Sequence, residues 1–296
     1  MFKLGHFDFC VIGSGVIVNR LLHDKRFSQS RILIISDQMS ARSDLLGNPK
    51  ETLVLSRKEF IESEPGISVG TLVVSAKTHL WSNNLDFDLL LRRALECQVS
   101  RVIHLSSGSV YGESNGYSKE TSDLKPVNSY GRQKLLEEES IRKVFGGKSP
   151  ILALRISNVY GDRTFQDFIN RCIEAAFKSN SLEVFSNGTL HRDFLYVENL
   201  IQIVGELLDT KLNAEIEYLN ISSGTRVSIA EVITQISHIL SIEIKQLVIS
   251  KPSGVVQNSL LDNSKLNQRV SWTPHALEEG LTEYIISQFP ELTKPL

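Results

Sequence analysis

Tyr130 and Lys134 stand four residues apart in a segment whose pattern favours a helix. On a helix, residues four apart share one face, so the lysine ammonium lies on the same side as the phenol. A nearby positive charge stabilises a phenolate and lowers its pKa from about 10, which lets tyrosine act as a general base. The same spacing also arises by chance, so the position of the Tyr–Lys pair in the fold is the stronger argument for a catalytic role. Ser107 ends an apolar run 23 residues before Tyr130, at the edge where doubly wound folds bind ligands.

A second group of residues has the chemistry of a dinucleotide site. Gly13, Ser14 and Gly15 lie between an apolar run and a helix-like segment, and Asp37 ends the next apolar run. Glycines at this place allow a tight turn and close approach to a pyrophosphate, and the acid binds ribose hydroxyls. An ordinary strand-to-helix turn is the simpler alternative, because Val18 replaces the third glycine of the usual motif.

The acid at the end of the second run bears on the choice of cofactor. The carboxylate of Asp37 would accept hydrogen bonds from a ribose diol and repel a 2′-phosphate, so we expect NAD. NADP remains the alternative. In that case Ser36 would occupy the specificity position and Arg42 would receive the phosphate.

The first half of the chain alternates short apolar runs with longer amphipathic stretches, which is the pattern of βαβ units. The runs are continuously apolar, as in strands covered on both faces. They predict the α/β class, with a Rossmann-like doubly wound parallel sheet. Strands are expected at residues 9–12, 32–35, 52–55, 72–75, 102–105 and 151–154, and helices at 16–24, 84–96 and from residue 130 onward.

Two domains are expected, because the pattern loosens after Gly161. A dinucleotide-binding Rossmann domain would cover residues 1–160, and a smaller C-terminal α/β substrate-binding domain would cover 161–296, with interleaved elements allowed. In the second part, helices are expected at 165–178, 197–208, 229–239 and 275–286, and a strand at 216–221. A cleft between two such domains is a common place for small-molecule sites.

Several short motifs follow one another in a fixed order. They are Gly13-Ser14-Gly15, SSGSVYG at 106–112, PVNSYGRQK at 126–134, LRISNVYG at 154–161, GTLHRDFLYVENL at 188–200 and WTP at 272–274. Together they resemble the extended short-chain dehydrogenase/reductases, in particular the NAD(P)-dependent nucleotide-sugar epimerases and dehydratases. The resemblance covers nearly the whole chain.

The resemblance implies an NAD(P)-dependent epimerase or ketoreductase that acts on a nucleotide-activated sugar. By position, Ser107 would hydrogen-bond the sugar oxygen that is oxidised or reduced, and Tyr130 would move its proton. Lys134 would hold the nicotinamide ribose and tune Tyr130. Gly13, Ser14, Gly15 and Asp37 would complete the cofactor site.

Substrate and subunit contacts are also implied by the resemblance. Asn158 and Arg192 match positions that contact the substrate diphosphate, and the planar fork of arginine suits phosphate oxygens. An ion pair between Arg192 and Asp193 is the simpler alternative for that arginine. Family members commonly dimerise through two helices that correspond to residues 84–96 and 130–145, so a homodimer is expected.

Departures from the family pattern limit the reaction. Gly108 and Ser109 stand where dehydratases carry an acid pair, which argues against sugar 4,6-dehydration. The altered glycine turn, with Ile12 and Val18, leaves one alternative from another class of protein. A catalytically silent family member would use the fold as a dinucleotide-binding or assembly scaffold. The intact set of Ser107, Tyr130 and Lys134 argues against it.

Two features receive a structural interpretation. His104 lies within an apolar run and is expected to be a hydrogen-bonded core histidine. The three glutamates at 137–139 are expected to form a solvated helix face.

Composition excludes several classes of protein. With 32 Lys and Arg against 34 Asp and Glu, the net charge is −2, which disfavours nucleic acid as a partner. The three cysteines show none of the spacings of zinc or redox sites, so we expect free thiols and no metal. No run approaches the ~18 apolar residues that a membrane span requires. We expect a soluble cytoplasmic protein with no membrane partner.

Overall fold

The structure is a computed structural model that describes residues 5–37, 50–63, 65–76, 85–179, 181–212 and 215–292. The chain divides into two compact units. Unit 1 comprises residues 1–107, 132–155 and 204–219, and unit 2 comprises residues 108–131, 156–203 and 220–296. Each unit is described by itself.

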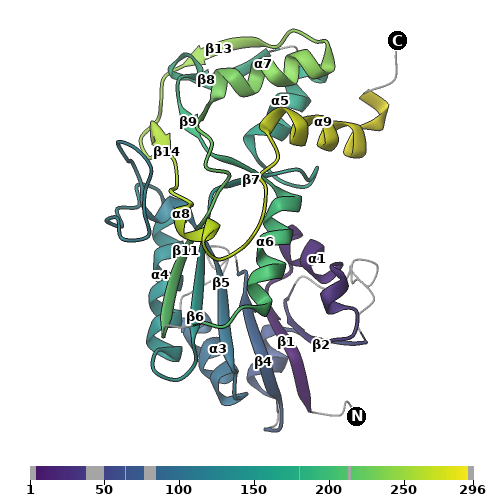
Figure 1. Cartoon of the computed structure of the whole chain (residues 1–296), viewed down its shortest axis with the longest axis vertical. Coiled ribbons are helices and arrows are strands. Elements are labelled where there is room, and N and C mark those ends of the chain that lie inside the picture. The colour runs from purple at the N-terminus through teal and green to yellow at the C-terminus, as the bar shows by residue number, and fades with distance from the viewer. Residues whose placement is uncertain are drawn as a thin grey trace. The chain divides into compact units, whose positions relative to one another are not determined.

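A seven-stranded sheet, in the order β11-β6-β5-β4-β1-β2-β3, is the centre of unit 1 (Figure 1). β1 pairs in parallel with β2 and β4, as do β2 with β3 and β4 with β5. From β3 to β6 this is the strand order of dinucleotide-binding folds, so the predicted fold class is confirmed. The strands are β1 His6–Ile12, β2 Arg31–Ile35, β3 Glu51–Leu55, β4 Ser68–Val74, β5 Arg101–Ser107, β6 Ile151–Ile156 and β11 Ile216–Ile221.

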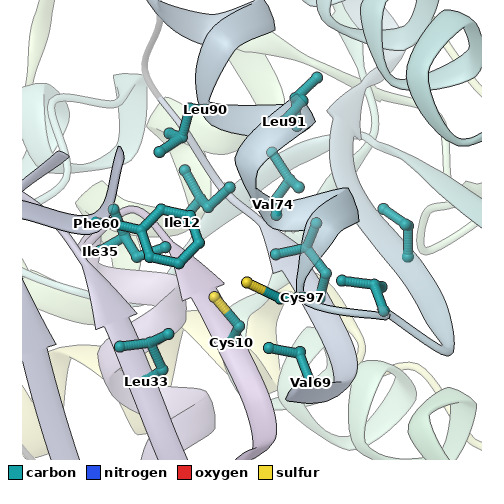
Figure 2. Close-up of a cluster of buried hydrophobic side chains, with 14 of the residues drawn as sticks. Cys10, Ile12, Leu33, Ile35, Phe60, Val69, Val74, Leu90, Leu91 and Cys97 are labelled. Carbon is teal, nitrogen blue, oxygen red and sulfur yellow. The ribbon is translucent and has the colours of Figure 1, made fainter. Parts of the chain in front are cut away.

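Apolar residues of the strands and helices form the core of unit 1. The helices are α1 Val16–Leu22, α2 Arg57–Ile61, α3 Leu85–Glu96 and α4 Ser129–Phe145, of which α4 begins in the unit 2 part of the chain. Figure 2 shows Leu90 and Leu91 of α3 above Ile12, Ile35 and Val74 of the sheet. All three cysteines are buried and free, as expected.

Local hydrogen bonds explain where the elements differ from expectation. The helix expected over 16–24 ends at Leu22, because the Asp24 carboxylate accepts from the backbone N–H of Arg26 at 2.9 Å and begins a 3₁₀ turn. The helix expected from residue 165 begins at Phe168, since Asp167 caps it through Asn170 N–H at 2.8 Å. The strand expected at 216–221 forms, but it joins the large sheet beside β6.

The described residues of unit 2 form three small sheets, with the strand orders β10-β7, β12-β9-β14 and β13-β8. Its strands are β7 Asn158–Tyr160, β8 Ser181–Phe185, β9 His191–Arg192, β10 Phe194–Tyr196, β12 Val227–Ser228, β13 Lys245–Ile249 and β14 Asn258–Ser259. Its helices are α5 Phe168–Lys178, α6 Val197–Asp209, α7 Ile229–Leu240, α8 Ser264–Asn267 and α9 Leu277–Gln288, of which α6 ends in the unit 1 part of the chain. Short 3₁₀ helices in the chain cover Lys25–Phe27, Gly108–Val110, Ser186–Gly188 and Pro290–Leu292. Within the described ranges, no helix has the length and apolar character needed to cross a membrane.

Candidate active site

The turn after β1 is built for glycine. Gly13 has a φ of +115°, which side chains rarely adopt, and a Cβ on it would lie 2.5 Å from the Ser75 carbonyl oxygen. Its N–H donates to the Ile35 carbonyl at 3.0 Å. The turn is therefore held by its contacts with the ends of β2 and β4.

Gly15, two residues later, has the opposite environment. It is the N-cap of α1, and no atom of the described residues lies within 4 Å of a Cβ built on it. This open space at the start of a helix fits the approach of a phosphate group. Val18 does not fill it, because its side chain is 2% exposed and belongs to the buried face of α1. The valine that motivated the scaffold alternative thus packs into unit 1.

The end of β2 carries a polar cluster. The Ser14 and Ser36 hydroxyl oxygens are 2.7 Å apart. Asp37 accepts from the Arg57 backbone N–H at 2.9 Å and forms an ion pair with the Arg57 guanidinium. Arg42, the residue of the NADP alternative, lies outside the described residues.

The three predicted catalytic residues occupy the end of β5 and the first two turns of α4. Ser107 is the last residue of β5 and is buried, whereas Tyr130 is 42% exposed. α4 starts here because Asn128 Oδ1 accepts from Gly131 N–H at 2.8 Å. A Cβ on Gly131 would overlap the Ser109 carbonyl oxygen, so a glycine lets the helix start against the loop after β5.

Lys134 is buried, and its ammonium has three acceptors. Nζ donates to the Leu105 carbonyl at 3.1 Å, the Ala76 carbonyl at 3.2 Å and Glu137 Oε2 at 2.8 Å. An ammonium has three N–H donors, so these contacts account for all of them. They fix the lysine beside the carboxyl ends of β4 and β5.

The glutamate run is not a solvated face, and that expectation was wrong. Glu137 and Glu138 are 1% and 5% exposed, and only Glu139 faces solvent. Glu138 pairs with Arg155 at 2.8 Å and accepts from the Ser106 hydroxyl at 2.5 Å. The signal was present in the sequence, because residues three and four after Lys134 share its helix face.

Glu137 and His104 form a buried pair behind the lysine. His104 Nε2 lies 3.1 Å from Glu137 Oε2. Burial would raise the pKa of Glu137, but the hydrogen bond from His104 and the charge of Lys134 outweigh it and lower the pKa to about 2. Burial lowers the pKa of His104, so the ring is neutral and donates through Nε2. His104 is a core histidine, as expected, but among the described residues its Nδ1 has no partner.

In unit 2, the predicted diphosphate residues lie on strands of two different small sheets, Asn158 on β7 and Arg192 on β9. Asn158 begins β7 and its amide donates to the Asp193 carbonyl at 3.0 Å. The Arg192 guanidinium donates to the carbonyls of His191, Val256 and Gln257 at 2.7 to 3.2 Å, which uses three of its five N–H donors. Burial lowers the pKa of Arg192 while the charge of Glu113 opposes this shift.

The expected alternative for Arg192, an ion pair with Asp193, is not formed in the described part of the chain. Asp193 is fully buried and accepts instead from the Ser157 hydroxyl at 3.0 Å and from the Ser223 and Gly224 N–H groups at 2.8 Å. Burial raises the pKa of this carboxyl to about 6. Asp193 thus fixes the loop after β11, and Arg192 is held by main-chain carbonyls.

The middle part of the chain matches the model of a known protein family. The model of the NAD dependent epimerase/dehydratase family matches residues 69–221, just over half of the chain. The chain belongs to this family. This membership confirms the resemblance that the motifs indicated. That resemblance was to the extended short-chain dehydrogenase/reductases, in particular to nucleotide-sugar epimerases and dehydratases.

Individual relatives and one solved structure show how far the similarity extends. A Bacillus subtilis protein described as the uncharacterized UDP-glucose epimerase YtcB is 30% identical over 66% of this chain. The match spans 63% of that relative, which is less than two thirds of its length. An Escherichia coli dTDP-4-dehydro-6-deoxyglucose reductase is 26% identical over 93% of this chain and 95% of its own. The solved structure of MoeE5 with UDP-glucuronic acid and NAD, at 22% identity, superposes with a TM-score of 0.80 over 95% of this chain and 100% of that chain.

The two glycines of the family's turn should respond differently to alanine. Gly13→Ala places a side chain at positive φ against a carbonyl, so we expect a loss of roughly 1 to 3 kcal/mol in the free energy of unfolding. Gly15→Ala meets open space in the protein and should keep its stability within about 0.5 kcal/mol, yet weaken NAD binding by roughly tenfold. Urea unfolding and NAD titration measure the two effects. Normal NAD binding by Gly15→Ala would show that the pyrophosphate does not approach this glycine.

Proposed function

We propose that the protein is an NAD-dependent enzyme that epimerises or reduces a nucleotide-activated sugar by hydride transfer. The observation that carries this proposal is Lys134, whose ammonium is fixed beside the ends of β4 and β5, one helical turn after Tyr130. A buried lysine charge held at that place suits acid–base chemistry by a tyrosine. Family membership supports the same class of reaction.

The division of labour follows from the chemistry of each group. Tyr130 as phenolate takes the proton of a sugar hydroxyl, and the fixed charge of Lys134 favours the phenolate form. Ser107 hydrogen-bonds the sugar oxygen. NAD supplies the hydride acceptor when it is bound. Return of that hydride to the opposite face of the sugar would give epimerisation. Reduction of a keto sugar would instead need NADH as the hydride donor, with the Tyr130 phenol donating the proton.

The proposed cofactor is NAD, held by unit 1. Gly13 and Gly15 fit the close approach of a pyrophosphate, and Asp37 fits a ribose diol. The paired Arg57 orients the Asp37 carboxylate through its backbone and side-chain N–H groups. We assign the same cofactor-binding residues as expected from the sequence, with Arg57 added.

The proposed substrate is a uridine diphosphate sugar, bound through its diphosphate by unit 2. The relatives support this choice, since one is described as a UDP-glucose epimerase and MoeE5 is solved with UDP-glucuronic acid. Among the described residues, two of the five N–H donors of Arg192 have no acceptor, which leaves them for a phosphate. Asn158 pairs in parallel register with Phe194, the residue after Asp193. The homodimer stays a prediction. Leu89 on α3 and Leu136 on α4 are 49% and 44% exposed, which is compatible with it.

The catalytic assignment predicts a selective loss in a Tyr130→Phe protein. Turnover should fall by about 10²-fold or more, because the acid–base group is gone, while NAD binds normally. Tyr117→Phe is the matched control, since Tyr117 is 45% exposed and has no proposed role. UDP-glucose and UDP-glucuronic acid serve as probes, with epimers and reduced products separated by chromatography. A Tyr130→Phe protein with wild-type turnover would show that another group moves the proton.

The ion pair of Asp37 and Arg57 predicts that a substitution at Asp37 changes the cofactor preference. Asp37→Asn removes the charge that repels a 2′-phosphate and leaves Arg57 to attract it, so the affinity for NADP relative to NAD should rise by roughly tenfold. Adding Arg57→Leu should abolish most of that gain. Fluorescence titration of both cofactors measures the ratio. Tighter binding of NADP than NAD by the wild-type protein would contradict the role of Asp37.

A further inference from the structure

One of the three consecutive glutamates on α4 is bound to the proposed catalytic lysine. Glu137 Oε2 lies 2.8 Å from Lys134 Nζ and 3.1 Å from His104 Nε2, and all three side chains are buried. Glu138 next to it is paired with Arg155, and Glu139 faces solvent. Glu137 is therefore the carboxylate that compensates the charge of Lys134.

The surroundings offer no second counter-charge to the lysine among the described residues. The groups that face this pair from neighbouring elements are His104 on β5, which is neutral, and Arg155 on β6, whose charge is matched by Glu138. On α3, Asp88 approaches α4 at Lys143, at 4.0 Å. Replacing Glu137 by a neutral residue of the same shape would leave a buried, unbalanced ammonium.

That balance bears on the oxidation state of the cofactor. The nicotinamide ring carries a positive charge in NAD and none in NADH. An uncompensated lysine near its ribose repels the oxidised form and leaves the reduced form unaffected. A compensating carboxylate removes this penalty, and a buried one acts at low effective dielectric constant.

We propose that Glu137, held in place by His104, is a positioning residue whose charge offsets that of Lys134 at the nicotinamide ring and so favours bound NAD over bound NADH. The inference rests on the proposed function and on the position beside Lys134 that the family resemblance implies for the nicotinamide ribose. Glu137 touches neither cofactor nor substrate. It acts through the lysine, whose Nζ it draws against the carbonyls of Ala76 and Leu105.

The test is the ratio of the dissociation constants for NAD and NADH, measured by calorimetry on the full chain. In Glu137→Gln, which keeps the shape and removes the charge, the NAD/NADH ratio should rise by about 15-fold, as expected for one unit charge over ~10 Å at a dielectric constant near 20. Glu137→Asp keeps the charge and should stay near the wild-type ratio. Glu139→Gln is the matched control on the solvent side and should not change it.

The ratio separates this role from a merely structural one, because a loosened site would weaken both forms alike. An unchanged ratio in a folded Glu137→Gln protein would overturn the inference. If that variant does not fold, Lys134→Met gives the opposite test, since it leaves Glu137 uncompensated and should lower the ratio. An unchanged or raised ratio there would also overturn it. A wild-type protein that binds neither NAD nor NADH would instead refute the proposed function, and this inference with it.

Discussion

The buried charge of Lys134 is the constraint around which the edge of the large sheet is organised. An ammonium removed from water is costly unless it is paired and hydrogen-bonded, and Glu137 and two main-chain carbonyls meet that need. Glu138, one helical turn after Lys134, joins α4 to Arg155 of β6 and Ser106 of β5. These two pairs fix α4 against β4, β5 and β6.

The end of β4 links this network to the glycine turn. The carbonyl of Ser75 blocks any side chain at Gly13, and the carbonyl of the next residue, Ala76, accepts from Lys134. Two consecutive residues therefore contact the proposed pyrophosphate turn and the proposed catalytic lysine. Within unit 1, a change in the path of this segment would move both the glycine turn and Lys134. The segment therefore keeps their relative positions fixed.

The parts of the fold that the sequence predicted are those with a strong local signal. The apolar runs that became β1 to β6 are short, β-branched and bounded by glycine or polar residues, and the motifs around Ser107 and Tyr130 carried the family. The membership of β11 in the large sheet was not predictable from periodicity, because strand pairing between distant segments leaves no local pattern. The contacts of Arg57 and Arg192 depend on such pairings as well.

The glutamate run shows a different limit. Charged residues are rarely buried unless paired, so a run of three is ordinarily a surface feature. The burial of Glu137 and Glu138 follows from helix geometry once Lys134 is assigned to the sheet side. It also depends on Arg155, whose own burial is seen only in the sheet.

Calorimetric titration of the wild-type protein with NAD shows whether unit 1 holds this cofactor. We predict saturable binding with one NAD per chain. Absence of saturable binding for NAD and NADP alike would contradict the account and favour a scaffold that has kept the fold without its cofactor.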